Sequence, residues 1–318
     1  MTFINHSSKD GIIGLLVGDA VGVPYEFLDR QMIARQPAVD MIGYGTHQQP
    51  AGTWSDDGAL TVALLVSLIH YPQLDTIDLG RRFIQWYRQG LWGAHYEVFD
   101  IGIATRKAIA HIEADPDHPE QAGGLDEYSN GNGSLMRILP LIYKLVDQDA
   151  STRLDWITRV SSLTHRHPVS ILAGIIYVEI GIQLLQASSS TTIQDCYQKA
   201  CHIVNTQYAD YPEIERYQRL LAGSIDQYPM EEISSSGYVV HTLEASIWVL
   251  LRTSNYRDAI LQAVNLGEDT DTTAAVAGGL AGIYYGYDQI PGEWIKPLAR
   301  LEEMVEYCER FDQQGESS

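Results

Sequence analysis

The sequence predicts an all-α fold in one compact, multi-helix domain that spans residues 1–318. Apolar residues recur at intervals of three and four along most of the chain, and strand-like alternation is nearly absent. Prolines fall between the apolar segments, and no Pro/Gly/Ser-rich linker or internal repeat divides the chain. We expect residues 1–9 and 311–318 to be flexible, as chain ends often are.

The positions of the apolar residues predict the individual helices. Near the N-terminus, "GIIGLLVGDAVG" predicts a helix whose ridge of glycines lets another backbone approach closely. Near the C-terminus, "TTAAVAGGLAGIYYG" predicts a second helix of small residues. Between these two, the segments expected to be helical are 60–69, 79–87, 101–112, 135–146, 171–185, 243–251 and 260–264. The loops between helices are predicted by Pro72, Pro116, Pro119, Pro212 and Pro229.

The composition excludes some classes of function. The chain carries 41 acidic and 21 basic residues, with a formal net charge of -20, so most of its surface should repel phosphate backbones and anionic membranes. We therefore expect no membrane binding and no non-specific nucleic-acid binding. The three cysteines lack C-x-x-C spacing, which predicts buried, reduced thiols. No signal-peptide pattern and no uninterrupted apolar window of membrane-spanning length is found, so we expect a cytoplasmic protein.

Two carboxylates interrupt the first apolar segment. Asp19 lies inside the Gly/Val-rich helix, and Glu26 follows Pro24. A buried carboxylate is costly unless it is paired or faces a site. Each residue is therefore either a structural hydrogen-bond acceptor or part of a functional site.

Two clusters of aspartates open apolar helices that lie far apart in the chain. "TWSDDGAL" and "GEDTDTT" each combine two aspartates with flanking hydroxyl residues. One interpretation is that they cap their helices, whose first N–H groups need acceptors. However, one cap needs one oxygen, whereas the clusters supply four carboxylates, and Mg²⁺ prefers oxygen ligands. The sequence thus favours a two-metal site with the ligands Ser55, Asp56, Asp57, Asp269, Asp271 and Thr272.

A glycine-rich loop precedes another apolar segment. In "YSNGNGSLMRILPL", residues 130–134 lead into the expected helix that begins at residue 135. Glycine-permitted turns expose backbone N–H groups and a helix N-terminus attracts anions, so this loop is a candidate cradle for a phosphate or diphosphate. The alternative is an ordinary turn and helix cap.

Together these motifs resemble the ADP-ribosylglycohydrolase family, of the dinitrogenase-reductase-activating glycohydrolase type. The matching pieces occur in family order over about residues 11–285 and are "GLLVGDAVGVPYE", "GTWSDDGAL", "FDIGIATRKAI", "NGNGSLMRILPL", "THRHP", "GYVVHTLEASIW" and "LGEDTDTTAAVAGGLAGIYYG". The resemblance implies an all-α fold around two Mg²⁺ ions, for which Mn²⁺ can substitute. It also implies hydrolysis of the bond between ADP-ribose and an acceptor, often an arginine of a modified protein, or a small ADP-ribosylated molecule.

The resemblance places the aspartate clusters on metal-ligand positions and implies further roles. Glu26 falls where some relatives have a carboxylate near the scissile bond, and Asp100 falls on an acidic position that faces the acceptor. His165 matches a histidine that lines the ADP-ribose pocket, with a helix-capping histidine as the alternative. Tyr238 is expected near the ligand, with ordinary packing as the alternative. Gly58 departs from the family, because many relatives have threonine there. The diphosphate and ribose loop falls on Gly131, Asn132, Gly133, Ser134 and Met136.

The implied chemistry is glycosidic cleavage through an oxocarbenium-like state by an activated water. The proton is expected to be handled by one carboxylate, either Glu26, Asp100, Asp57 or Asp269. The alternatives are a hydrolase of serine-linked or O-acetyl-ADP-ribose and a non-catalytic ADP-ribose-binding relative. "DTDTT" also fits a motif of haloacid-dehalogenase-type phosphatases, but that motif follows an early strand of an α/β domain, whereas here it is late and precedes a helix.

Overall fold

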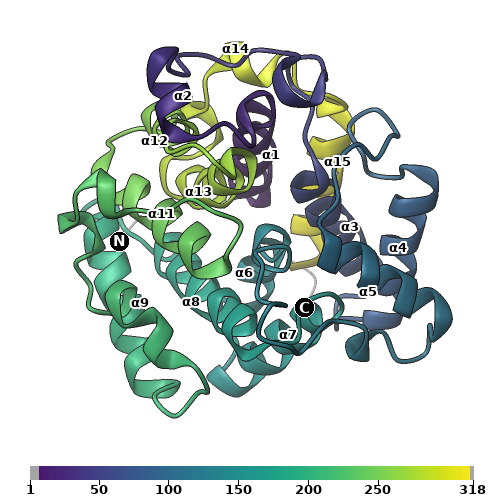
Figure 1. Ribbon diagram of the computed structural model, residues 1–318. Helices are drawn as coiled ribbons and strands as arrows, with labels where there is room; N and C mark the ends of the chain where they lie inside the picture. Colours follow the sequence, from purple (N-terminus) through teal and green to yellow (C-terminus); the bar gives the residue numbers. More distant parts are fainter. Residues whose placement is uncertain (1–6, 316–318) are drawn as a thin grey trace.

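The structure is a computed structural model that describes residues 7–315. This part of the chain contains fifteen α-helices and eight short 3-10 helices. It contains no strand, only three isolated β-bridges. The predicted all-α class is confirmed. Helices from the two ends of the sequence lie side by side in the upper part of the view (Figure 1).

Helices α1 (Ser8–Gly22) and α13 (Thr270–Tyr285) pack against each other through glycines. A Cβ atom added at Gly14 would lie 2.5 Å from the carbonyl oxygen of Gly278, and one added at Gly22 would overlap the backbone of Asp271. The predicted glycine ridge is therefore a packing surface. Because the helices run antiparallel, the end of α1 and the following Glu26 lie beside the start of α13.

The first aspartate cluster reaches the same place on α3 (Asp56–His70). This helix contacts α1 and α13 and is also covered by α4 (Thr76–Gln89) and α15 (Leu301–Gly315). Helix α5 (Ile103–Ala114) packs on α4 and begins just after the loop that carries Asp100. The end of α1, the start of α3 and the start of α13 thus lie close together, and their polar residues gather there.

Helix α8 (Pro168–Leu185) lies in the core, between α7 (Ala150–Ser162), α9 (Ile193–Gln207) and α11 (Val239–Arg252). By length and composition α8 resembles a membrane span, with a mean hydropathy of 1.8 over 18 residues. However, 89% of this window is buried inside the protein, as in the core helix of a soluble protein. The remaining helices are α2 (Arg30–Arg35), α6 (Pro140–Leu145), α10 (Gln218–Leu221), α12 (Tyr256–Asn265) and α14 (Gly292–Ile295).

One expected helix is wrong. The segment 135–146 is divided into a 3-10 turn (Leu135–Arg137) and α6, which begins at Pro140. Proline has no N–H to continue a preceding helix, but it is well suited to the first position of a new one. The glycine-rich loop therefore leads into a single 3-10 turn. We expected an α-helix to begin directly after this loop, and in the described residues none does.

The described parts of the chain ends are helical where we expected flexibility. Ser7 caps α1 and its Oγ donates to Asp312 Oδ2 at 2.6 Å, while Phe311 on α15 is buried. These contacts tie residues 7–9 to residues 311–315. Residues 1–6 and 316–318, for which flexibility was also expected, lie outside the described residues.

The three cysteines, Cys196, Cys201 and Cys308, are buried and form no disulfide, as predicted. Burial raises the pKa of the Cys196 and Cys201 thiols to about 11. They are therefore apolar core residues at neutral pH.

Candidate active site

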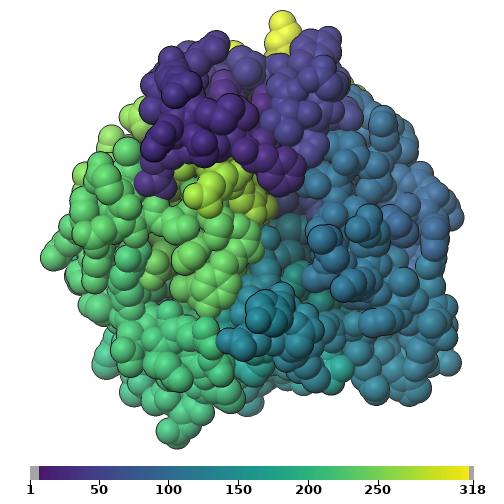
Figure 2. Space-filling view, viewed as in Figure 1, coloured from purple at the N-terminus to yellow at the C-terminus, as the bar shows by residue number. Residues whose placement is uncertain are grey.

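A pocket of about 440 Å³ lies where α1, α3 and α13 meet the loops around residues 100 and 130. In the space-filling view the surface is hollowed where purple, yellow-green and blue segments meet (Figure 2). The residues of the sequence prediction that line this pocket are Glu26, Asp56, Asp57, Asp100, Gly131, Asn132, Gly133, Met136, His165, Asp269 and Thr272.

The first aspartate cluster is held by Asp19 of α1. The Asp19 carboxylate accepts hydrogen bonds from the backbone N–H groups of Ser55 at 2.9 Å and Gly58 at 2.8 Å. Ser55 itself caps α3, because its Oγ accepts from the N–H of Asp57 at 3.2 Å. Burial raises the pKa of Asp19 to about 7. Asp19 is thus a structural acceptor that fixes the start of α3, which frees Asp56 and Asp57 from that task.

The second cluster is connected to the first and to the glycine-rich loop. Asp269 is the N-cap residue of α13, but its side chain makes no capping bond and instead accepts from Asn132 Nδ2 at 2.8 Å. Thr272 Oγ1 donates to Asp57 Oδ2 at 3.3 Å, and the N–H of Thr272 donates to Asp271 Oδ1 at 2.9 Å. Segments more than 200 residues apart thus share one hydrogen-bond network.

These carboxylates could hold a metal. The oxygens Asp57 Oδ1, Asp269 Oδ1 and Asp271 Oδ2 are buried and accept no hydrogen bond from residues 7–315. Burial, together with the neighbouring carboxylates, raises the pKa of Asp56, Asp57 and Asp271 well above the ordinary value. Buried oxygens of this kind need a compensating charge, and an all-oxygen donor set suits a hard divalent cation. The residues present therefore fit a divalent-cation site.

The glycine-rich loop lies against His165. A Cβ added at Gly133 would lie 2.7 Å from His165 Cε1, so only glycine fits there without displacement. The N–H of Asn132 donates to the carbonyl of Gly237 at 3.1 Å, which joins the loop to the segment before α11. Burial, together with the nearby Arg137, lowers the pKa of His165 to about 3, so this imidazole is neutral at physiological pH. His167, and not His165, caps α8.

Some of the predicted residues do not line the pocket. Tyr238 lies at the start of α11, with its ring packed edge-on against His241 at a centroid distance of 5.0 Å. Ser134 is buried, and its Oγ has no partner among residues 7–315. Ser55 and Asp271 lie just behind the lining residues, within the hydrogen-bond network described above.

Gly58, the departure from the family pattern, is enclosed by apolar side chains. A Cβ added there would lie 2.7 Å from Leu16 Cδ2 and 2.7 Å from the ring of Trp54. A threonine at this position would therefore require Leu16 or Trp54 to move.

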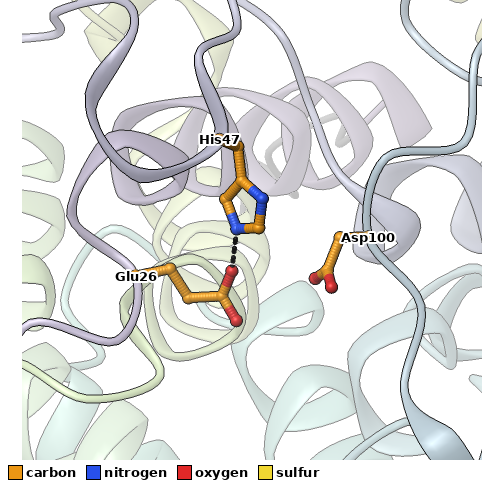
Figure 3. Close-up of side chains that lie close together, drawn as sticks. All are labelled: Glu26, His47 and Asp100. Atoms are coloured by element: carbon orange, nitrogen blue, oxygen red, sulfur yellow. Dashed lines mark hydrogen bonds and ion pairs between the residues drawn. The ribbon is translucent and has the colours of Figure 1, made fainter.

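The sequence analysis missed two residues of the site. His47, in the 3-10 turn Gly45–His47, bonds the Glu26 carboxylate through Nε2 (Figure 3). Arg137 is fully buried, and its guanidinium donates to the carbonyls of Gly133 and Val160, which supports the glycine-rich loop from behind. A lone arginine inside the apolar run "SLMRILPL" was a signal of a buried cation. His47 belongs to no motif, so no comparable signal marked it.

The mouth of the pocket is apolar. Phe27, Ile103 and Tyr128 line it and are 69%, 65% and 92% exposed. Large exposed apolar side chains that gather at a cleft indicate a binding site. Here they surround an interior of carboxylates and backbone amides.

Comparison with known proteins identifies the family. The family model described as ADP-ribosylglycohydrolase matches residues 6–318. An ADP-ribosylarginine hydrolase of Pseudomonas putida is 32% identical over 296 residues, which cover 92% of this chain and 74% of the relative. The ADP-ribosyl-(dinitrogen reductase) glycohydrolase of Rhodospirillum rubrum is 29% identical, in an alignment that covers 93% of this chain and 91% of the relative.

More distant relatives and the fold agree with this result. ADP-ribosylhydrolase ARH3 of Homo sapiens is 27% identical over 335 residues, which cover 92% of this chain and 89% of the relative. A solved structure described as an ADP-ribosylglycohydrolase-related protein complex superposes with a TM-score of 0.79 at 29% identity and covers 96% of both chains. The chain therefore belongs to the ADP-ribosylglycohydrolase family of enzymes.

Proposed function

We propose that this enzyme is a Mg²⁺-dependent hydrolase that removes ADP-ribose from ADP-ribosyl-arginine on proteins. The observation that carries this proposal is a set of buried carboxylate oxygens that accept no hydrogen bond from residues 7–315 and lie beside a pocket of about 440 Å³. Such a set needs cations, and it is joined to the glycine-rich loop by the hydrogen bond from Asn132 to Asp269.

Two Mg²⁺ ions, or Mn²⁺ in their place, are the proposed cofactors. When bound, such ions polarise ribose hydroxyls and lower the pKa of a coordinated water. The residues that would hold them are Ser55, Asp56, Asp57, Asp269, Asp271 and Thr272. Hydrogen bonds from Asn132 and Thr272 orient two of these carboxylates, those of Asp269 and Asp57.

Glu26 is the best supported candidate for handling the proton. Burial raises its pKa to about 7, so near neutral pH it can both hold and release a proton. Of the other three candidates, Asp57 and Asp269 are proposed ligands of the cations, and Asp100 is proposed to pair with the acceptor. Glu26 also lines the pocket together with Asp100.

Arginine is the proposed acceptor. Two relatives carry names that specify ADP-ribosylarginine or a modified protein, and both cover more than 90% of this chain. Asp100 is half-buried at the pocket wall, where a carboxylate can pair with a guanidinium through two charge-assisted hydrogen bonds. Serine-linked and O-acetyl-ADP-ribose need no such carboxylate, so Asp100 distinguishes these substrates.

A release assay on arginine-, serine- and acetyl-linked ADP-ribose tests the acceptor. We expect release from arginine, weakened about ten- to a hundred-fold by Asp100→Asn, because one charged hydrogen-bonded contact is lost. Glu97→Gln, an exposed change on the same loop, serves as the control and should have little effect. Release only from serine or acetyl linkages, with no effect of Asp100→Asn, would overturn the arginine assignment.

A further inference from the structure

The two ring nitrogens of His165 have different surroundings. Nδ1 lies 2.8 Å from Thr164 Oγ1. Nε2 has no hydrogen-bond partner among residues 7–315, although His165 is only 3% exposed and lines the pocket. A Cβ added at Gly131 or Gly133 would lie 3.5 Å or 3.4 Å from Nε2, so this nitrogen lies beside the glycine-rich loop. Nε2 is therefore the polar atom that His165 offers to a ligand.

The tautomer of His165 decides what this atom can do. Burial and the charge of Arg137 lower the pKa of His165 to about 3, so the ring holds a single proton near neutral pH. A neutral imidazole donates through one nitrogen and accepts through the other. If the proton is on Nδ1, Nε2 is an acceptor, and if the proton is on Nε2, the pocket contains an N–H donor.

The hydroxyl of Thr164 determines the choice between these tautomers. Thr164 is fully buried, and among residues 7–315 its Oγ1 has a hydrogen-bond partner only in His165 Nδ1. If Nδ1 carried the proton, it would donate to Oγ1, and the hydroxyl proton of Thr164 would be buried without an acceptor, which is costly. If Thr164 donates to Nδ1 instead, both groups are satisfied and the ring proton lies on Nε2.

The backbone that carries this pair is held in place. The N–H groups of Thr164 and His165 donate to the carbonyl of Ser161 at 3.1 Å and 2.8 Å, and Ser161 Oγ donates to the carbonyl of His165 at 2.9 Å. The N–H of Arg166 donates to the carbonyl of Gly124 at 3.0 Å. The hydroxyl and the ring therefore extend from a backbone that is fixed to the end of α7.

We propose that Thr164 is a positioning residue that fixes His165 in its Nε2–H tautomer, so that the pocket presents a hydrogen-bond donor beside the glycine-rich loop. A ligand atom held there must be an acceptor, which we assign to an oxygen of ADP-ribose, and an amine or amide N–H is disfavoured at this place. The identity of the ligand rests on the proposed function. The tautomer itself follows from the contact between Thr164 and His165.

The test uses Thr164→Val, which removes the hydroxyl with little change of shape, and Thr164→Ser, which keeps it. Thr76→Val is the control, because Thr76 is also buried and its Oγ1 donates to Glu120 Oε1 at 2.6 Å, outside the pocket lining. The tautomer is measured by nitrogen NMR of protein with isotope-labelled histidine, and the His165 signals are assigned from their absence in His165→Gln. ADP-ribose binding is measured by calorimetry with saturating Mg²⁺.

In the parent protein we expect the His165 proton on Nε2. In Thr164→Val we expect a mixture of both tautomers, because the hydrogen bond that favours one of them is lost. ADP-ribose affinity should fall about three- to ten-fold, as expected for one hydrogen bond between neutral groups. Thr164→Ser should restore the parent tautomer and affinity, and Thr76→Val should leave both unchanged.

A parent His165 with its proton on Nδ1 would overturn the inference, and this spectrum decides the question even if Thr164→Val fails to fold. Weaker binding in Thr164→Val with an unchanged tautomer would show a merely structural role and overturn it too. Parent-like affinity in Thr164→Val would show that the ligand does not use this donor, which also contradicts the inference. A parent protein that has the Nε2–H tautomer but binds no ADP-ribose would instead overturn the proposed function, so the two failures are distinguishable.

Discussion

Asp19 offers a direct test of how the fold prepares the candidate active site. Asp19→Ala leaves the buried N–H groups of Ser55 and Gly58 without an acceptor. Each unsatisfied donor costs about 1–3 kcal/mol, so the two together cost about 2–6 kcal/mol. Removal of a carboxylate that burial disfavours offsets part of this cost, so we expect a net loss of about 1–4 kcal/mol in the free energy of unfolding.

The assay for Asp19→Ala combines urea denaturation of the metal-free protein with Mn²⁺ titration. We expect a lower denaturation midpoint and weaker Mn²⁺ binding, because the start of α3 carries two of the proposed ligands. Asp149→Ala is the matched control, since Asp149 caps α7 at the surface by accepting from the N–H of Thr152 at 2.8 Å. It should cost about 1 kcal/mol and leave Mn²⁺ binding unchanged. Parent-like stability and Mn²⁺ affinity in Asp19→Ala would refute the reasoning.

Two further predictions concern the buried carboxylates. Asp271→Ala should abolish turnover yet raise the urea midpoint of the metal-free protein, because it relieves repulsion; near-parent turnover would exclude a role as ligand. The metal-free protein should also lose stability as pH rises. Burial raises the pKa of Asp19 and Glu26 to about 7 in the folded state, so their contribution is fully present below about pH 4 and is lost as pH rises through 7. Urea midpoints at pH 5 and pH 8 measure this, and a higher midpoint at pH 8 would contradict it.

The helical architecture could be predicted because helix burial leaves a periodic pattern in the sequence. The glycines of α1 predicted close packing, and the structure supplies the partner, α13, which the sequence pattern could not name. The failure at 135–146 has a local cause: the apolar pattern continues through Pro140, but the hydrogen-bond ladder does not. The periodicity of apolar residues indicates which face of a helix is buried. It does not indicate whether the helical hydrogen bonds of the backbone continue without a break.

From the residues alone, the candidate site was predictable only where polar residues are clustered in the sequence; Asp100 and His165, which also line the pocket, were predicted from the family resemblance. The aspartate clusters and the glycine-rich loop are local motifs, and the structure brings them together. The contact between Glu26 and His47 joins two loop residues with no shared period, and Asp19 could be predicted to be buried but its N–H donors could not. Such contacts depend on tertiary packing, which a single sequence does not specify.

Metal dependence tests the central claim most directly. The enzyme is treated with EDTA, and release of ADP-ribose from ADP-ribosyl-arginine is measured before and after Mg²⁺ is restored. Because the proposed ligands are all oxygen atoms, we predict that activity is lost in the chelator and regained with Mg²⁺ or Mn²⁺. Full turnover in EDTA would contradict the account.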